Sequence, residues 1–518
     1  MGLLRTESYR SGITLSIGFS LLAKLAALAS SLALAAFFGT SEEMDVYVYV
    51  LFVATLVTTF VSALNSAVLI PEAMRVKEQE GERAAMQLVN FFLYAYAALG
   101  LAVAAVFLVN PAAAFTALSR FDGEVLRAHA PLLYAALPLF PLILVSGFLV
   151  DVLASRKYFT VPMIASMAAN ACVLVFVLAF HRGLGAMSAL LGLSVAYAAQ
   201  TAALLALMRR GLAWEFGRTP YRPSHAVLSN SGLAQLGNLA TALSSYVPMF
   251  MLSGLDRGTV SAMNYGRQAA EFPNNFVTQQ FSSVAGIKLN EVFAKKQEEE
   301  VDRVAIASMK GLFFALVPAA LFGAVYARQL IGLLFGRGAF GADSVSAAAA
   351  FFRLFALLLP FYAANSITAR LFLAAQKIKQ AFWYQLAMNL LMAAAIAAGV
   401  AAYGALGYPA ALLACHVFAL FAVGLLTVKY FPRVRYWDAA LYLLKVAALD
   451  AAVLAPVWLA AERYGPRGDL PQVLLAAGAY FALLLPLSVL LGVNKDFSSA
   501  LKELKARAAG LFGRPPAG

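Results

Sequence analysis

The chain has 518 residues, of which 62% are hydrophobic and only 13% are charged, whereas ordinary soluble proteins contain about 25% charged residues. This composition excludes a soluble globular protein. The formal net charge of +13 is compatible with nucleic-acid binding, but the basic residues lie mainly in the connections between long apolar stretches. That distribution is typical of a membrane protein, and we expect no nucleic-acid partner.

Fourteen apolar stretches follow one another along the chain and predict fourteen transmembrane helices. A helix rises about 1.5 Å per residue, so roughly 20 apolar residues cross a hydrocarbon core of about 30 Å. The stretches lack the alternation of a membrane β-barrel, so we predict an all-α polytopic membrane protein. The predicted spans cover residues 13–38, 45–70, 86–109, 131–154, 159–180, 186–208, 227–253, 259–287, 306–327, 345–374, 381–403, 408–428, 439–460 and 471–493.

The distribution of basic residues predicts the topology. When the N-terminus is placed in the cytoplasm, most of the 39 Lys and Arg residues fall in cytoplasmic connections. The positive-inside rule therefore predicts a multi-pass membrane protein with both termini in the cytoplasm. The two cysteines, Cys172 and Cys415, fall within predicted spans and indicate neither a disulfide framework nor a metal site.

The connection at 209–226 contains four arginines and two prolines and predicts a cytoplasmic linker between two lobes of six spans each. The N-lobe is predicted over 1–208, with spans 1–6, and the C-lobe over 227–430, with spans 7–12. Residues 431–493 then form accessory spans 13 and 14. The tail at 494–518 has leucines at helical spacing between basic residues, which predicts an amphipathic helix on the inner leaflet.

Several charged residues are expected to have structural roles. The run KKQEEEVDR at 295–303 is typical of a solvent-exposed helical extension of span 8. Asp151 lies beside Arg156 and Lys157 at the predicted inner end of span 4, where an interfacial ion pair is expected. Lys445 and Asp450 fall on span 13, outside both predicted lobes, and are expected to be structural or to lie near the interface.

No pattern of catalytic residues is found. Only four histidines occur, and none lies at ligand spacing from a cysteine or a carboxylate. The phosphate-binding pattern GxxxxGK[ST] does not occur either, so the sequence predicts neither an enzyme nor a cofactor.

Four stretches resemble a known family. Together they indicate the MurJ/MviN family of lipid-linked oligosaccharide flippases, part of the superfamily (MOP) that includes MATE drug exporters, and the resemblance extends over essentially the whole chain. The turn FGRGAF between spans 9 and 10 is the most specific of them. The stretches are Phe38-Gly39 followed by Asp45, LSGLDRGTVSAMNYGRQAAEFP from Leu252 to Pro273, LLFGRGAFGADS from Leu333 to Ser344, and ARLFLAAQKIK from Ala369 to Lys379.

The resemblance implies a V-shaped bundle of two lobes around a polar cavity that opens alternately to the two sides of the membrane. It implies a polyprenyl-diphosphate carrying a sugar headgroup as cargo, moved from the inner to the outer leaflet of the bacterial inner membrane. Membrane lipids and a glycan polymerase are the expected partners. Proton, sodium and membrane potential all stay open as the energy source.

Charged side chains inside a bilayer cost at least about 2.5–3.5 kcal/mol and normally face a cavity. Lys24, Arg267 and Arg353 lie within predicted spans with only Glu271 nearby in sequence, and this positive surplus suits a diphosphate. Alternatively, Arg267 and Glu271 neutralise each other at i,i+4 spacing, and Arg353 extends to the interface. Two further candidates for sugar binding, with helix packing as their alternative, are Gln235 and Asn238.

The chain departs from the cavity arginines that peptidoglycan-precursor flippases of this family carry on spans 1, 2 and 8. Lys24 occupies the first of these positions. Ser30, Thr58 and Gln268 occupy others. The departures favour an exopolysaccharide-pathway paralogue over a flippase of the peptidoglycan precursor. Two alternative functions stay open, that of a MATE-like cation-coupled exporter of amphipathic molecules and that of a scaffold of a glycan-assembly complex.

Overall fold

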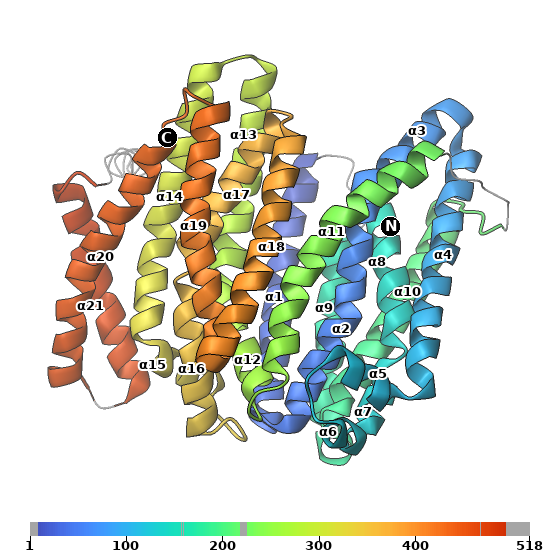
Figure 1. The fold of residues 1–518 in the computed structure, drawn as a ribbon, viewed down its shortest axis with the longest axis horizontal. Helices are drawn as coiled ribbons and strands as arrows, with labels where there is room; N and C mark the ends of the chain where they lie inside the picture. Colours follow the sequence, from blue (N-terminus) through green and yellow to red (C-terminus); the bar gives the residue numbers. More distant parts are fainter. Residues whose placement is uncertain (1–8, 157, 159, 218–224, 467, 494–518) are drawn as a thin grey trace, which may run out of the picture. The chain divides into compact units, whose positions relative to one another are not determined.

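The computed structural model describes residues 9–156, 158, 160–217, 225–466 and 468–493. In this part of the chain every regular element is a helix, which confirms the all-α prediction (Figure 1). The predicted amphipathic tail at 494–518 and most of the predicted linker, from 218 to 224, lie outside the described residues.

Each of the fourteen predicted spans coincides with one helix or with a run of consecutive helices. The first six are α1 (Tyr9–Phe38), α2 (Glu42–Leu64) with the π-helix η1 (Asn65–Leu69), α4 (Glu82–Val109), α7 (Ala130–Ala136) with α8 (Leu139–Ser155), α9 (Val161–Leu184) and α10 (Met187–Gly211). The next six are α11 (His225–Leu252), α12 (Thr259–Pro273) with the π-helix η2 (Asn274–Thr278) and α13 (Gln279–Ala294), α14 (Glu298–Val325), α16 (Ala342–Ala356) with α17 (Leu359–Ala374), α18 (Ile378–Tyr403) and α19 (Gly407–Tyr430).

The last two spans are α20 (Tyr436–Tyr464) and α21 (Asp469–Leu490). Shorter helices complete the described chain: α3 (Ile70–Glu80), α5 (Pro111–Leu118), α6 (Gly123–Ala128), α15 (Ala327–Phe335) and the 3₁₀-helix η3 (Gly404–Leu406). The boundaries differ from the predicted ones mainly because polar helical turns extend several helices beyond their apolar stretch.

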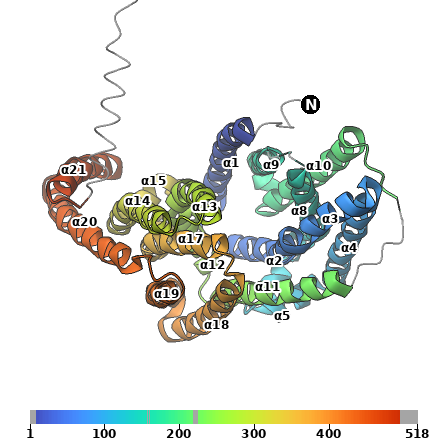
Figure 2. The same cartoon turned by 90° about the horizontal axis from the view of Figure 1, so that it is seen from above.

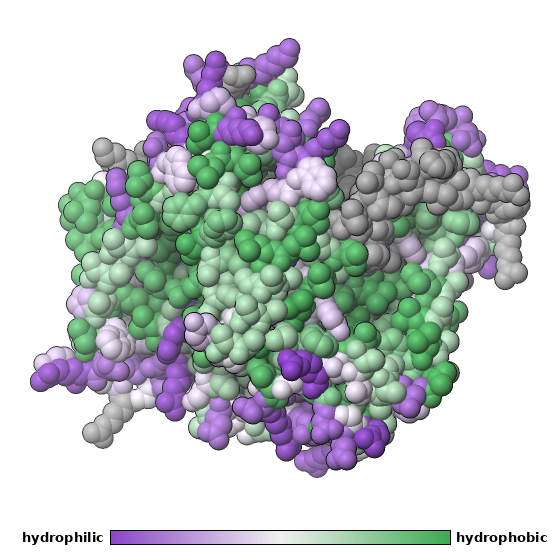
Figure 3. Space-filling model, in the orientation of Figure 1, coloured by the Kyte–Doolittle hydropathy of each residue, from purple (hydrophilic) through white to green (hydrophobic). Residues whose placement is uncertain are grey.

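Length and hydropathy distinguish these helices. Within the described residues, eight helical segments are long and apolar enough to cross a membrane, and a ninth is obtained if α16 and α17, which meet at a bend of 40°, form one span. The helix that carries Arg267 and Glu271, α12, is not among them, and it has only 15 residues. On the face drawn in Figure 3, hydrophobic residues cover the middle of the helices and hydrophilic residues gather at their ends.

The chain divides into two compact units. Their boundaries pass through several helices, and the predicted division into lobes at 208 and 227 stays a prediction. Unit 1 comprises Met1–Tyr265, Leu334–Ala348 and Phe382–Leu412, and unit 2 comprises Gly266–Leu333, Ala349–Ala381 and Leu413–Gly518.

Unit 1 contains a polar network among its packed helices. The Asn65 side-chain amide donates a hydrogen bond of 2.8 Å to the Asp151 carboxylate, and the Tyr96 hydroxyl donates one of 2.9 Å to the Asn65 side-chain oxygen. Arg156 pairs instead with Glu82. Asp151 is therefore not paired with Arg156, because residues five apart on a helix project from different faces. Lys157, the other predicted partner of Asp151, lies outside the described residues.

The two π-helices occupy corresponding places in the two predicted lobes. η1 lies in the second span of the first six, and η2 lies in the second span of the next six. Each begins at an asparagine, Asn65 or Asn274, and π-turns inside α-helices are frequent at functional sites. Their positions are those expected if the two halves are structural repeats.

In unit 2, α14 packs against α13, α17 and α20, and α21 packs against α20 (Figure 2). The Asp302 carboxylate accepts hydrogen bonds from the Arg435 backbone amide at 2.8 Å and from its guanidinium at 2.9 and 3.0 Å, which ties the start of α20 to α14. Asp302 also raises the pKa of Arg435, through a hydrogen bond and charge. The run at 295–303 forms the turn from α13 to α14 and the beginning of α14, rather than only an extension of span 8.

The accessory helices contain a buried acid. The Asp450 side chain is fully buried on α20, and neither of its carboxylate oxygens has a hydrogen-bond partner among the described residues. The Tyr480 hydroxyl of α21 is likewise buried without such a partner. Lys445, on the same helix as Asp450, is exposed. Buried polar groups without partners cost free energy.

Candidate functional site

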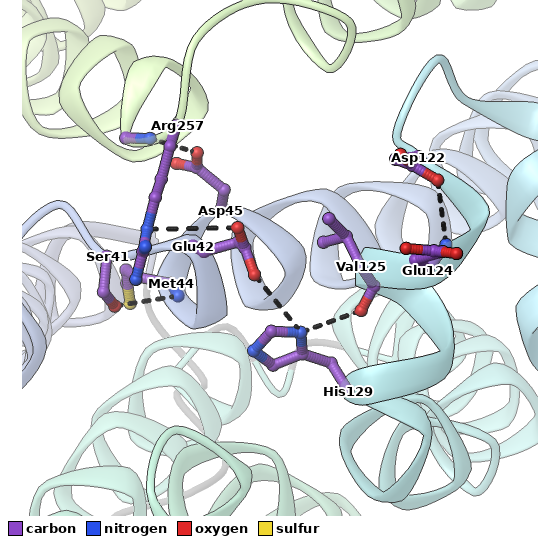
Figure 4. A network of polar contacts seen from close by, with 10 residues as sticks. Ser41, Glu42, Met44, Asp45, Asp122, Glu124, Val125, His129 and Arg257 are labelled. Atoms are coloured by element: carbon purple, nitrogen blue, oxygen red, sulfur yellow. Dashed lines mark hydrogen bonds and ion pairs between the residues drawn. The ribbon is translucent and has the colours of Figure 1, made fainter.

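Three of the stretches that carry the family resemblance meet within unit 1. The end of α1, the start of α2, the turn before α12 and the turn before α16 contact one another there. We call this cluster the junction and define it by Gly39, Asp45, Gly258, Ser261 and Gly338. Part of it is drawn in Figure 4.

Asp45 joins α2 to the beginning of α12. Its carboxylate accepts hydrogen bonds from the backbone amide of Gly258 at 2.6 Å and from that of Ser261 at 2.7 Å. The first amides of a helix have no partner within the helix and carry a partial positive charge, so a carboxylate is the group that stabilises them best. Asp45 is therefore a helix cap supplied by a different helix, and only 2% of it is exposed.

Two glycines allow the turn after α1 and the turn before α16 to approach each other closely at the junction. Gly338 has a φ of +59°, and a Cβ atom on it would lie 2.2 Å from the Ala36 carbonyl oxygen. Gly39 has a φ of +56°, and its Cβ would lie 2.4 Å from the Ala339 carbonyl oxygen. The Ala339 amide donates a hydrogen bond of 2.8 Å to Ala36 across this contact. The FGRGAF turn and the Phe38-Gly39 pair thus fit together because neither glycine has a side chain.

Aromatic packing and hydroxyl contacts support the same cluster. Phe335 and Phe340 of the FGRGAF turn pack against the Tyr265 ring, with centroid distances of 5.2 and 5.3 Å. The Thr40 and Ser344 hydroxyls lie 2.7 Å apart, which links the turn after α1 to α16. The aromatic residues of the FGRGAF turn therefore pack against α12, while Gly338 allows the close contact with the end of α1.

Substituting Gly338 with alanine is expected to destabilise the junction. The clash is with backbone atoms that cannot rotate away, and alanine also disfavours a positive φ. We expect a loss of at least about 2 kcal/mol in the free energy of unfolding, measured by thermal unfolding of the protein in detergent. Gly341→Ala is the matched control, since nothing lies within 4 Å of a Cβ there. Equal unfolding temperatures for the two variants would contradict this interpretation.

Two further acids at the start of α2 were missed in the sequence. The Glu43 carboxylate accepts a hydrogen bond of 2.7 Å from the Ala186 amide at the beginning of α10. Glu42 lies 3.9 Å from the Arg257 guanidinium and 4.0 Å from the His129 imidazole (Figure 4). The available signal was three carboxylates in the first turn of one helix. The N-terminus of one helix does not need three carboxylates for its free amides, so some of these carboxylates are expected to contact other elements.

The predicted cations fall in different units. Lys24 is half-buried on α1 in unit 1. In unit 2, Arg267 and Glu271 form an ion pair of 3.8 Å on α12, with about a third of each side chain exposed. The Arg353 guanidinium donates a hydrogen bond of 3.1 Å to the Ala324 carbonyl oxygen at the end of α14. Arg353 thus stabilises a helix C-terminus, whose carbonyl groups lack partners within the helix.

The structure describes only some of the polar candidates on span 7 and of the residues that replace the family's arginines on spans 1 and 2. The side chains of Gln235 and Thr58 lie outside the described residues. Asn238 is half-buried on α11. The Ser30 hydroxyl is buried and donates a hydrogen bond of 2.9 Å to the Asn170 carbonyl oxygen of α9. Ser30 therefore joins two helices of unit 1.

Comparisons with known proteins agree with this architecture. A family model described as lipid II flippase MurJ matches residues 34–469. A probable lipid II flippase MurJ of Thermotoga maritima is 26% identical over 392 residues, which are 73% of this chain and 78% of that relative. A solved structure of lipid II flippase MurJ in an inward closed conformation has a TM-score of 0.76 at 17% identity, and the match covers 92% of this chain and all of that one.

A second solved structure, an inward-facing multidrug resistance MATE transporter of the MOP superfamily, has a TM-score of 0.64 at 13% identity, covering 82% of this chain and 98% of that one. The structural matches confirm the polytopic helical membrane fold, and the family match confirms the resemblance. The protein is thus a multi-pass inner-membrane transporter of a lipid-linked precursor, and not an enzyme. From its motifs, its fold and the match over most of its length, the chain belongs to the MurJ family of lipid II flippases.

Proposed function

We propose that this protein moves a polyprenyl-diphosphate-linked saccharide from the inner to the outer leaflet by alternating access, with both termini in the cytoplasm. The observation that carries the proposal is the cationic character of the predicted spans of a chain that belongs to a lipid flippase family. Lys24, Arg267 and Arg353 are the groups proposed to bind the diphosphate. Gln235 and Asn238 are proposed to bind the sugar.

The geometry of Arg267 supports this role. Its ion pair with Glu271 is 3.8 Å long, whereas a hydrogen-bonded pair of this kind is about 2.7–2.9 Å. A guanidinium binds phosphate oxygens through two parallel hydrogen bonds, so Arg267 has the chemistry that a diphosphate requires. Glu271 then orients Arg267 before the cargo arrives, or carries a proton during the cycle.

We infer that the cargo is the precursor of an exopolysaccharide or another cell-surface glycan. This inference is supported by the residues that replace the expected arginines. Ser30 is already used in the contact with α9, and Gln268 is neutral. A headgroup that needs fewer cationic contacts than the peptidoglycan precursor suits such a site. The expected partner is the glycan polymerase that consumes the flipped precursor.

Transfer of labelled headgroups across proteoliposomes tests the proposal. The purified protein is reconstituted with a polyprenyl-diphosphate oligosaccharide, with the peptidoglycan precursor, or with a polyprenyl-monophosphate sugar. We expect transfer of the diphosphate oligosaccharide and little transfer of the monophosphate, because the proposed cations bind both phosphates. Absence of transfer with every diphosphate lipid would contradict the flippase proposal. A preference for the peptidoglycan precursor would contradict only the exopolysaccharide assignment.

A further inference from the structure

A pocket of about 670 Å³ lies in unit 2 between the end of α13 and the beginning of α14. It is not part of the junction and contains none of the residues proposed to bind the cargo. Hydrophilic residues gather at the tip of the α13–α14 hairpin, next to the charged end of this pocket (Figures 1 and 3).

The lining of the pocket is charged near the connecting turn and mostly apolar farther along the helices, where Gln280 and Ser308 are its polar members. Phe281 and Val284 on α13 are 45% and 69% exposed, although both are large and apolar. Val304 lines the α14 side. Lys288 on α13 and Arg303 on α14 lie closer to the connecting turn, with Lys288 seven residues, or about 10 Å, beyond Phe281. Such a division matches an amphiphile with an anionic head.

The predicted spans place the pocket at the depth where a lipid headgroup meets the acyl chains. Predicted span 8 ends at residue 287 and predicted span 9 begins at residue 306. Lys288 and Arg303 therefore fall just outside the hydrocarbon core, while Phe281 and Val284 fall within it. The positive-inside rule places this connection in the cytoplasm, where anionic lipids attract basic residues.

The net charge of the pocket lining matches a ligand that carries a single negative charge. Lys288 and Arg303 supply two positive charges, and Glu300 supplies one negative charge. Glu291 lies 3.5 Å from Lys288 but only 2.6 Å from Lys295, so Lys295 is its closer partner. The hydrogen bond from Lys295 also lowers the pKa of the Glu291 carboxyl. The net positive charge of one matches a phosphodiester, whereas a diphosphate carries more negative charge than this lining neutralises.

We propose that this pocket binds one anionic phospholipid of the inner leaflet. Its phosphate lies between Lys288 and Arg303, and one acyl chain lies along Phe281 and Val284. The bound lipid covers apolar side chains that are otherwise exposed, and it holds the α13–α14 hairpin at the membrane surface. This proposal does not depend on the identity of the cargo.

Native mass spectrometry of the purified full-length protein, with phosphatidylglycerol or phosphatidylcholine added, tests the site. We expect phosphatidylglycerol to bind more tightly than phosphatidylcholine. The double variant Lys288→Ala/Arg303→Ala is expected to weaken phosphatidylglycerol binding by at least about tenfold, because two charge-assisted contacts are lost. Val284→Trp, which fills the apolar part, is expected to weaken binding while leaving both cations in place. Lys296→Ala, in the exposed turn outside the pocket, is the control and should bind normally.

Three outcomes would overturn the proposal. The first is equal binding of phosphatidylglycerol by the wild type and the double variant. The second is displacement of the lipid by millimolar inorganic phosphate, which would indicate a simple anion site. The third is tighter binding of polyprenyl diphosphate through Lys288 and Arg303, which would assign the pocket to the cargo. The lipid measurement does not use transport, so a failure of the flippase proposal would leave its result unaffected.

Discussion

Replacing Asp45 with alanine is expected to lower the free energy of unfolding by roughly 3–6 kcal/mol and to abolish transport. The substitution removes both acceptors of the Gly258 and Ser261 amides, which lie in a buried site. Each buried amide without a partner costs about 1–3 kcal/mol, and the charge-assisted hydrogen bond is lost as well. Thermal unfolding in detergent and complementation of a flippase-deficient strain measure the two effects.

Transport is expected to fail because Asp45 fixes the beginning of the helix that carries Arg267. Arg267 lies eight residues after Thr259, the first residue of α12, and is therefore about 12 Å along the helix. A shift at the start of α12 moves the guanidinium relative to its cargo. Asp45→Asn is expected to behave almost like alanine, because its amide group would place a donor opposite one of the backbone amides.

Asp256→Ala is the matched control for Asp45. Asp256 is an exposed carboxylate in the same turn before α12, so its removal changes the net charge equally. We expect wild-type unfolding and wild-type export for this variant. Wild-type stability of Asp45→Ala would show that the two amides do not depend on this carboxylate and would contradict the capping role.

Lys24→Ala and Arg267→Ala are each expected to reduce transport on the order of 10- to 100-fold, while the protein remains folded in the membrane. Each substitution removes a charged hydrogen-bond donor proposed to bind the diphosphate. Lys24→Arg keeps the charge and should retain much of the activity. Arg267→Lys keeps the charge but loses bidentate binding, so an intermediate rate is expected. Headgroup transfer in proteoliposomes is the measurement.

Lys445→Ala serves as the control for Lys24, since Lys445 is an exposed lysine of a predicted span in the accessory helices. It should transport at the wild-type rate. Glu271→Gln separates two roles of the carboxylate. If Glu271 only orients Arg267, the amide should preserve most of the transport, whereas loss of transport at every pH would indicate that Glu271 carries a proton. Wild-type transport by both Lys24→Ala and Arg267→Ala would contradict the diphosphate site.

The membrane fold is the part that the sequence determines most directly. An apolar stretch of about 20 residues in a bilayer can satisfy its backbone only as a helix, so hydropathy locates each span without knowledge of its neighbours. The fourteen predicted spans therefore coincide with helices, including α20 and α21. The FGRGAF turn and Phe38-Gly39 were recognised as family motifs, although the sequence did not show that the two turns contact each other.

Partners across long sequence separations could not be predicted in this way. Asp45 was noticed only as part of a motif, while its hydrogen bonds go to residues more than 200 positions later. Asp151 was assigned to a near neighbour, Arg156, but the structure pairs it with Asn65. Asp302 lies in a run that suggests only a solvated surface, yet it holds Arg435. In each case the sequence showed the charged residue but not the residue with which it interacts.

The sequence by itself thus determined that this is a helical membrane protein, where its apolar helices lie along the chain and to which family it belongs, because these depend on local hydropathy and on short motifs. Only the tertiary structure decided what the acidic residues do. Glu43 and Asp45, two positions apart on α2, serve the starts of two different helices, α10 and α12. A carboxylate acts over a few ångströms, and which helix end lies within that distance is set by the packing of the whole bundle.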